Sequence, residues 1–181
     1  MALTVEDGTG LAAADAYASV ATVDAYVTAY LRDHATWTGA TTADKEQSIR
    51  EATQTLDLLF GGRWIGRKKS SAQALAWPRA SAVDPDGWEV ASTAVPAQVE
   101  DAVAELAWKH LNDTGPSTTT GDSTGIIADN STPAVSEETV KVGPITSTTK
   151  WAGVKPGSST FRKVALILKA LLNPPGRMER A

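Results

Sequence analysis

Apolar residues recur at helical spacing in four parts of the chain, and the first two parts lie within residues 1–60. Ser19 precedes the first apolar run and can cap a helix by accepting a backbone N–H of its first turn. The second helix begins at Thr41 or Thr42, because Thr41 and Asp44 have the spacing of a capping box. Gly61-Gly62 follows its last apolar residue, and we expect it to end the helix in the left-handed conformation. The two apolar faces are Val23, Tyr26, Val27, Tyr30 and Leu31, and Ile49, Ala52, Leu56, Leu59 and Phe60.

The two later helices have boundaries of the same kind. Val95-Pro96 opens the third, because proline fits the first turn, where its missing N–H leaves no bond unmade. Glu105 and Lys109 have the spacing of an outward-facing ion pair on this helix. The fourth covers residues 160–172 and ends at the Asn-Pro-Pro-Gly run, since neither proline can continue a helix. Their apolar faces are Val99, Val103, Leu106 and His110, and Phe161, Val164, Leu168, Leu171 and Leu172, widened by Leu166 and Ile167.

Polar and turn-forming segments separate these helices. Residues 64–88 predict extended and turning chain, with an Asp-Pro-Asp-Gly tight turn near the end. Residues 113–125 and 128–138 are a Ser/Thr/Gly/Pro-rich arm, and residues 139–149 alternate enough for a short strand or hairpin broken at Gly143-Pro144. We therefore expect a mainly α fold, a small bundle of about four helices with an extended loop or hairpin and a long C-terminal arm ending in a helix. The expected divisions are a helical core (1–111), the arm (112–159) and the last helix with its tail (160–181).

The apolar face of the last helix has two possible binding partners. Its apolar face follows a polar tether of more than forty residues, counted from the end of the third helix. It can pack back on its own domain, or it can fill a groove on another subunit, as amphipathic helices do. The residues alone favour neither.

Composition narrows the function. The net charge of −4 argues against a protein that coats duplex DNA through bulk charge. The sequence has no cysteine and two histidines, which excludes thiolate chemistry and leaves few ligands for zinc. No apolar run approaches the roughly 18 residues of a membrane-spanning helix, and the N-terminus lacks a secretory leader pattern. We expect a protein made and used in cytoplasm, with no membrane partner.

Catalytic motifs are weak. The Gly8-Thr9-Gly10 run lacks the strand and lysine of a phosphate loop, and the Asp-Pro-Asp-Gly turn lacks calcium-loop spacing. His34 and His110 have no nucleophile or acid arranged beside them, and the position of His110 on an apolar face indicates a core histidine. Glu105 and its neighbouring acids fit a solvated helix face better than paired acid–base catalysts. We expect no enzymatic activity, no cofactor and no metal.

Charge is unevenly distributed along the chain. Residues 1–60 hold nine acids against three bases, whereas residues 61–82 hold five bases and no acid, and residues 160–181 are again basic. The bases of the middle segment are Arg63, Arg67, Lys68, Lys69 and Arg79, with Trp64 and Trp77 among them. Cations interleaved with aromatics are typical of single-stranded DNA binders. The alternative is that the tryptophans are core or interface anchors and the charges belong to a solvated loop.

Several runs resemble one family of phage and prophage proteins. They are VEDGTGLAAADAYASVATVDAYVTAY (5–30), ALAWPR (74–79), the Asp86-Gly87 turn, VPAQVEDAVAELA (95–107) and VGPI (142–145). The resemblance covers residues 3–111 and then only the VGPI run and the helical C-terminus, while the Ser/Thr-rich arm departs from compact members. Members are labelled DnaT-like single-stranded DNA-binding proteins and are similar to the head–tail connector, or adaptor, proteins of tailed phages.

The resemblance implies a structural protein of the virion neck that is assembled in the bacterial host cytoplasm. Twelve copies of the chain are implied to form a ring below the portal. Its implied partners are the portal protein, a stopper or tail-terminator protein, and genomic DNA that passes through the channel without sequence-specific binding. A single-stranded DNA-binding replication accessory protein is the alternative.

The resemblance also assigns roles to residues. Portal docking falls to Phe161, Val164, Leu168, Leu171 and Leu172. A loop projecting from the core, which Pro78 directs by excluding Trp77 from helical conformation, is expected to meet a neighbouring subunit or the tail side. Its contact residues are Trp64, Trp77, Pro78, Arg79 and Trp88. The pattern of cations among aromatics, and not the resemblance, offers Arg63, Arg67, Lys68 and Lys69 as the candidate DNA-facing residues.

Overall fold

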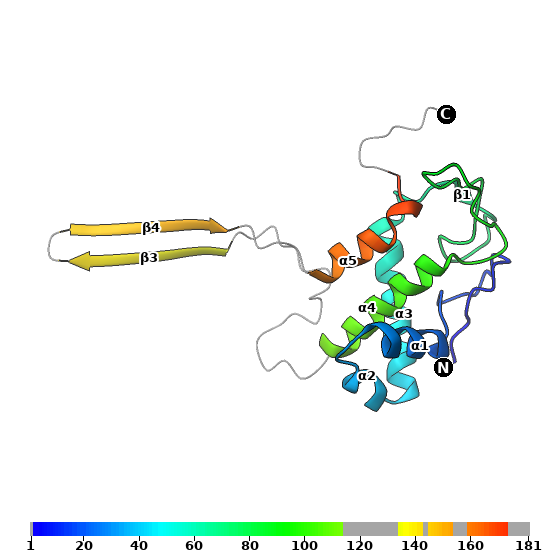
Figure 1. Cartoon of the computed structure of the whole chain (residues 1–181), viewed down its shortest axis with the longest axis horizontal. Coiled ribbons are helices and arrows are strands. Elements are labelled where there is room, and N and C mark those ends of the chain that lie inside the picture. Colours follow the sequence, from blue (N-terminus) through cyan, green and yellow to red (C-terminus); the bar gives the residue numbers. More distant parts are fainter. Residues whose placement is uncertain (1, 114–133, 143–144, 154–158, 174–181) are drawn as a thin grey trace.

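The computed structural model describes residues 2–113, 134–142, 145–153 and 159–173, and these residues form a mainly helical protein, as expected (Figure 1). The elements are α1 (Val20–Tyr30), α2 (Ala35–Gly39), α3 (Thr42–Phe60), β1 (Arg67–Lys68), β2 (Arg79–Ala80), α4 (Ala97–Asp113), β3 (Ala134–Val142), β4 (Ile145–Gly153), α5 (Ser159–Ile167) and the 3-10 helix η1 (Lys169–Leu171). Helix α2 was not expected, because its five residues are too few for a helical period to be recognised. Within the described part of the chain, no helix is both long and apolar enough to cross a membrane.

The expected helix starts are confirmed by their capping bonds. The Ser19 hydroxyl accepts the backbone N–H of Thr22 at 3.1 Å, at the start of α1. The Thr41 hydroxyl accepts the N–H of Asp44 at 3.2 Å and donates to its carboxylate at 2.7 Å. Helix α4 begins directly after Pro96. Local sequence therefore decides where these three helices begin.

The expected left-handed ending of α3 is wrong. Gly61 has φ −51, in the right-handed region, and Gly62 is not among the described glycines with positive φ. Glycine is required at Gly61 for space, because a Cβ there would lie 2.5 Å from the carbonyl oxygen of Asp57. The helix ends by a close backbone approach instead of a conformation that only glycine favours.

Helices α3 and α4 pack against each other at the centre of the bundle, and α1 and α5 both pack on α4 (Figure 1). Helices α1, α3, α4 and α5 contribute fully buried side chains to one core, among them Val27, Leu56, Leu106 and Val164. Burying an aliphatic side chain of this size stabilises a fold by about 1.5–3 kcal/mol. Helix α5 thus shares one core with residues far earlier in the chain.

The last helix packs against its own chain. Val164, Leu168, Leu171 and Leu172 are buried, and these four residues are the apolar face that the resemblance assigns to portal docking. The expectation of a face left free for a partner is therefore corrected for them, because the bundle already covers it. The side chain of Phe161, the fifth predicted docking residue, lies outside the described part.

Backbone bonds hold the end of this helical segment in place. The Ile65 N–H donates to the Leu171 carbonyl at 3.1 Å, and the Asn173 N–H donates to the Arg63 carbonyl at 2.6 Å. Trp64 and Leu172 pair between these bonds as an isolated antiparallel bridge. The chain that follows α5 is thereby joined to the chain that follows α3.

The prediction that Glu105 faces outward is wrong. Its relative exposure is 4%, and its carboxylate accepts the Lys163 ammonium at 2.6 Å and the Tyr26 hydroxyl at 3.3 Å. Lys163 belongs to α5 and Tyr26 to α1, so one carboxylate on α4 joins three helices. The spacing of Glu105 and Lys109 within one helix could not indicate these partners.

Strands β3 and β4 form an antiparallel hairpin. The register runs from Ala134 opposite Gly153 to Val142 opposite Ile145. Strand β3 contains three Val residues and β4 contains three Thr residues, and both residue types favour extended chain. The expected short hairpin at residues 139–149 is therefore longer than its alternating pattern indicated, while Gly143-Pro144 and residues 114–133 of the arm lie outside the described residues.

Candidate nucleic-acid interface

The chain between α3 and α4 folds back on the bundle instead of projecting from it. Strands β1 and β2 pair antiparallel, with Arg67 opposite Ala80 and Lys68 opposite Arg79. The Trp77–Pro78 peptide is cis, and both residues are buried. The Trp77-Pro78 pair was expected to shape a projecting loop, but it is buried and anchors this loop to the core.

A buried hydroxyl and a carboxylate hold this loop to α3. Tyr17 donates to the Asp57 carboxylate at 2.8 Å, and its own oxygen accepts the backbone N–H groups of Ala76 at 2.8 Å and Trp77 at 3.1 Å. Burial raises the pKa of Asp57, while the bond from Tyr17 opposes that rise. Burial is also the main cause of a raised pKa at Tyr17. The network satisfies backbone donors that would otherwise be buried without a partner.

The two tryptophans predicted to lie among the cations are core residues. Trp64 is 3% exposed and Trp77 is 0% exposed. Their rings meet edge to face with centroids 5.7 Å apart, and Trp64 also lies 6.1 Å from the ring of Phe60. Neither ring face is available to a nucleobase, so the predicted interleaving of cations and aromatics does not occur at these two positions.

Arg79 is a buried cation with structural partners. Its guanidinium donates to the carbonyl oxygens of Ile65 at 2.6 Å, Gly66 at 2.6 Å and Ala76 at 3.2 Å. These bonds tie the two sides of the loop together, and they direct the charge away from solvent. Trp64, Trp77, Pro78 and Arg79 are thus all buried, which corrects the expectation that they form a contact surface.

The four predicted DNA-facing cations are exposed. Lys69 donates to the Gly8 carbonyl at 2.9 Å, and the Arg63 guanidinium lies 5.9 Å from the centroid of the Phe60 ring. Arg67 and Lys68, on β1, have no ion pair or side-chain hydrogen bond with any other described residue. Lys68 interacts electrostatically with the Asp57 carboxylate and opposes the rise in its pKa, while both side chains remain exposed to an anionic ligand. We call Arg63, Arg67, Lys68 and Lys69 the cationic edge.

Trp88 is the exposed aromatic of the same segment. Its relative exposure is 75%, and it follows Gly87, whose φ is +90. The Asp84 carboxylate accepts the N–H groups of Asp86 at 3.0 Å and Trp88 at 2.8 Å, which confirms the predicted tight turn. The sequence placed Trp88 in a contact loop together with Trp64 and Trp77. Nothing in the sequence indicated that Trp88 would be exposed while the other two would be buried.

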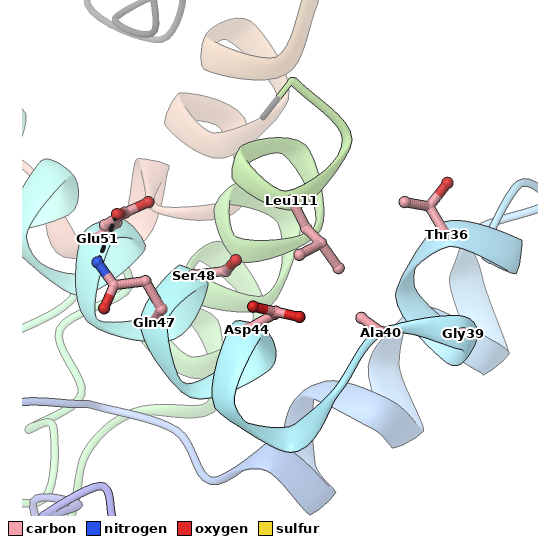
Figure 2. A pocket seen from close by; sticks show the side chains of 8 residues that line it. All are labelled: Thr36, Gly39, Ala40, Asp44, Gln47, Ser48, Glu51 and Leu111. Carbon is pink, nitrogen blue, oxygen red and sulfur yellow. Dashed lines mark hydrogen bonds between the residues drawn. The ribbon is translucent and has the colours of Figure 1, made fainter. Parts of the chain in front are cut away.

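A pocket at the other end of α3 has a volume of about 380 Å³ (Figure 2). It lies between α2, α3 and the end of α4. Its lining is Thr36, Gly39, Ala40, Asp44, Gln47, Ser48, Glu51 and Leu111. Glu51 accepts a hydrogen bond from Gln47 at 2.8 Å. Among the described residues, no group of three or more His, Asp or Glu side chains is placed to hold a metal ion.

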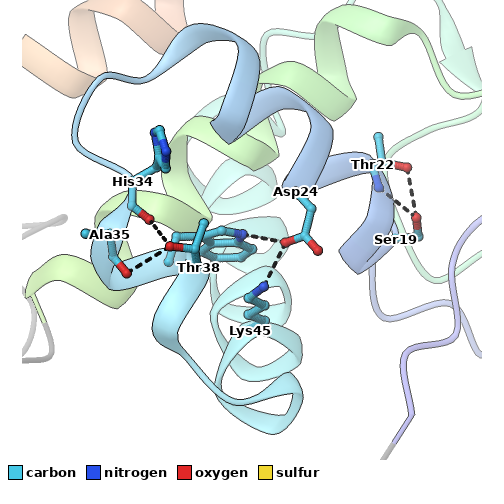
Figure 3. Close-up of polar contacts among 8 residues, drawn as sticks. Ser19, Thr22, Asp24, His34, Ala35, Thr38 and Lys45 are labelled. Atoms are coloured by element: carbon cyan, nitrogen blue, oxygen red, sulfur yellow. Dashed lines mark hydrogen bonds and ion pairs between the residues drawn. The ribbon is translucent and has the colours of Figure 1, made fainter.

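Both histidines have structural contacts. The His34 Nδ1 lies 2.9 Å from the Leu31 carbonyl, and the His34 carbonyl accepts the Thr38 hydroxyl at 3.1 Å (Figure 3). The His110 Nε2 lies 3.2 Å from the Thr55 hydroxyl, between α4 and α3. His110 is half-buried, and its Nδ1 lies 3.7 Å from the Glu51 carboxylate, so both ring nitrogens face α3.

Helix α2 is held by a carboxylate. Asp24 of α1 accepts the Trp37 indole N–H at 2.7 Å and the Lys45 ammonium at 2.9 Å, as Figure 3 shows for Asp24 and Lys45. Trp37 belongs to α2 and is fully buried. Asp24 therefore joins α1, α2 and α3, and its role is structural.

Comparison with known proteins identifies the family. A family model described as "Putative DnaT-like ssDNA binding protein" matches residues 1–181, the whole chain. The chain belongs to this family. No curated protein and no solved structure matches it. The DnaT-like part of the resemblance is therefore confirmed, whereas the comparison provides no evidence for a head–tail connector.

Proposed function

We propose that this DnaT-like protein binds single-stranded DNA through phosphate contacts made by the cationic edge. The observation that carries the proposal is the exposure of Arg67 and Lys68 on β1, with no ion pair to any described residue. The family description supports the same ligand. Lysine and arginine bind phosphates by replacing their counterions, so such contacts need no sequence readout.

The charge distribution limits the size of this contact. The net charge is −4, so attraction to DNA must come from a local cluster and not from the whole protein. Each phosphate contact with a single strand changes the slope of log affinity against log salt by about −0.7. The four residues of the cationic edge therefore predict a shallow slope of about −1.4 to −2.8, for two to four contacts.

The test is fluorescence polarisation of a labelled oligothymidine over a range of salt concentrations. The double variant Arg67→Ala/Lys68→Ala should bind more weakly and lose about 1.4 from the magnitude of the slope. Arg32→Ala is the matched control, because Arg32 is exposed and precedes α2 and the start of α3, whereas the cationic edge follows the end of this 19-residue helix, which is about 28 Å long. A wild-type protein that does not bind at low salt, or whose affinity is independent of salt, contradicts the proposal.

A second candidate is a subunit of the phage head–tail connector. Exposed apolar side chains favour a protein-binding role, and the largest exposures besides Trp88 are those of Tyr30, Leu58 and Leu166. Under this proposal the chain forms a dodecameric ring in the virion neck. The ring binds the portal and a stopper or tail-terminator protein, and it surrounds passing genomic DNA. Neither candidate requires a catalytic group, and we continue to expect a protein without enzymatic activity.

Co-sedimentation with portal rings from the same particle tests this candidate. Truncation before α5 would remove buried core residues such as Val164 and Leu168, so its failure to bind would not be informative. Leu166→Asp changes the exposed face of α5 and leaves the core unchanged, and Tyr30→Asp provides the control on α1. Loss of portal binding in Leu166→Asp alone supports docking by α5, whereas no sedimentation of the wild-type chain with the portal rejects the candidate.

A further inference from the structure

We propose that Trp88 is the residue on which a base of the bound single strand stacks. This inference rests on the proposed binding of single-stranded DNA. The sequence offered Trp64 and Trp77 for this role, and both are buried. Base–aromatic stacking needs an open ring face, which Trp88 provides.

Exposure distinguishes Trp88 from the tryptophans of the core. It is 75% exposed, while Trp37 and Trp77 are 0% exposed and Trp64 is 3% exposed. An indole that remains in water forgoes the hydrophobic stabilisation that its burial would provide. The ring is therefore available to a ligand that covers its face.

The turn holds Trp88 in a defined position before any ligand binds. Besides the two bonds to the Asp84 carboxylate, the Asp84 N–H donates to the Trp88 carbonyl at 2.9 Å. The Gly87 N–H donates to the Asp84 carbonyl at 3.1 Å. Because these bonds already fix the backbone of Trp88, a ligand that stacks on its ring has only the side chain left to order.

A short stretch of chain joins the turn to the cationic edge, although Ser81, with φ +54, interrupts the extended conformation between them. Ala80 of β2 pairs with Arg67, and two residues later Ala82 accepts the Val90 N–H at 2.8 Å. Asp84, which is hydrogen-bonded to Trp88, lies four positions after Ala80, and four steps along the chain span at most about 14 Å. The cations and the exposed indole are therefore close enough to contact neighbouring parts of one strand.

Acidic residues near Trp88 in the sequence limit where the phosphates of the bound strand can lie. Asp86 and Glu89, two residues before and one residue after Trp88 in the sequence, are exposed, and their charges oppose a phosphate near the turn. We therefore expect phosphates to contact β1 and only the base to reach the turn. Glu89→Gln should then tighten binding at low salt, because it removes a repulsive charge without changing the indole.

The experiment compares two oligonucleotides and four variants by fluorescence polarisation. One probe is labelled oligothymidine, and the other is an abasic oligomer of equal length, which keeps the phosphates and lacks the bases. The variants are Trp88→Ala, Trp88→Phe, Arg67→Ala/Lys68→Ala and the control Leu166→Ala, which removes an exposed apolar side chain from α5. Sedimentation velocity of each free protein reports its association state.

Trp88→Ala should weaken oligothymidine binding about fivefold to a hundredfold, and Trp88→Phe should restore part of the loss because it keeps a ring face. The same change should not alter binding of the abasic oligomer, whereas Arg67→Ala/Lys68→Ala should weaken both. Leu166→Ala should behave as the wild type.

Two results overturn the inference and leave the proposed function intact. One is wild-type affinity of Trp88→Ala for oligothymidine while the cationic variant binds weakly. The other is a changed sedimentation coefficient of free Trp88→Ala with unchanged DNA affinity, which assigns the indole to a contact between copies of the chain. Absence of wild-type binding to both probes instead rejects the proposed function itself.

Discussion

Replacing Lys163 by methionine should destabilise the fold by leaving a carboxylate buried without its cation. The Lys163 ammonium lies 2.6 Å from the Glu105 carboxylate, whose side chain is 6% exposed, while the side chain of Lys163 is 44% exposed. Removing one partner of a fully buried pair costs about 3–5 kcal/mol, and an exposed pair contributes about 0–1 kcal/mol. Because water reaches the lysine but hardly the glutamate, we expect a cost of about 1.5–2.5 kcal/mol for Lys163→Met.

Removing the charge of Glu105 instead of that of Lys163 should destabilise the fold less. Glu105→Gln removes the buried charge, keeps an oxygen for the Tyr26 hydroxyl, and leaves an ammonium that water can solvate. Its expected cost is about 0.5–1 kcal/mol. The double variant Glu105→Gln/Lys163→Met should therefore be more stable than Lys163→Met alone, which is the sign of coupling between contacting residues.

Urea unfolding followed by circular dichroism measures these differences as shifts of the midpoint at constant slope. Lys169→Met is the matched control, since Lys169 is an exposed lysine of η1, and it should change stability by less than about 0.5 kcal/mol. The reasoning is refuted if Lys163→Met is no less stable than Lys169→Met. It is also refuted if Glu105→Gln is the more damaging single change.

Three further predictions concern the loop anchored on α3, each measured by urea unfolding. Tyr17→Phe should cost about 1–3 kcal/mol, because the buried Trp77 N–H loses its acceptor while the Ala76 N–H keeps the Asp57 carboxylate at 3.0 Å, and a cost below about 0.5 kcal/mol would contradict this role. Trp77→Ala should lower the free energy of unfolding by about 3–5 kcal/mol because the ring is buried, whereas Trp88→Ala should lower it by less than about 0.5 kcal/mol because the ring is exposed. Equal losses would contradict the conclusion that only Trp77 is buried. The pKa of Asp57 is raised in the folded protein, so this group binds protons more tightly when folded, and its contribution to stability falls as the pH rises from 3.8 through the raised pKa. Asp57→Asn should therefore lose less stability than the wild type between pH 4 and pH 7, and an equal loss would show that Asp57 does not titrate in this way.

The starts of three helices could be predicted because their causes are local. Ser19, the Thr41–Asp44 capping box and Pro96 act within a turn of the residues they affect, and the structure confirms all three. The tight turn before Trp88 is local in the same sense. Helix α2 could not be predicted, since its five residues are placed by the bonds of Asp24 and by burial of Trp37.

The candidate site was predicted in part. The cationic edge is exposed as its charge suggested, but the predicted aromatics were not the available ones. Trp64 is covered because the chain after α5 pairs with it at Leu172, more than a hundred residues later. A sequence pattern shows that a segment contains tryptophans and cations, but it does not show which segment will return to cover them.

The sequence by itself determined the mainly helical class, the helix starts, the turn at residues 84–87 and the separation of charge along the chain. Each follows from residues within a few positions of one another. Only the tertiary structure decided that α5 packs on its own bundle, that Glu105 is buried against Lys163, and that Trp88 alone among the tryptophans of residues 61–94 is exposed. The physical reason is that burial depends on contacts between segments distant in sequence, and local periodicity carries no information about those contacts.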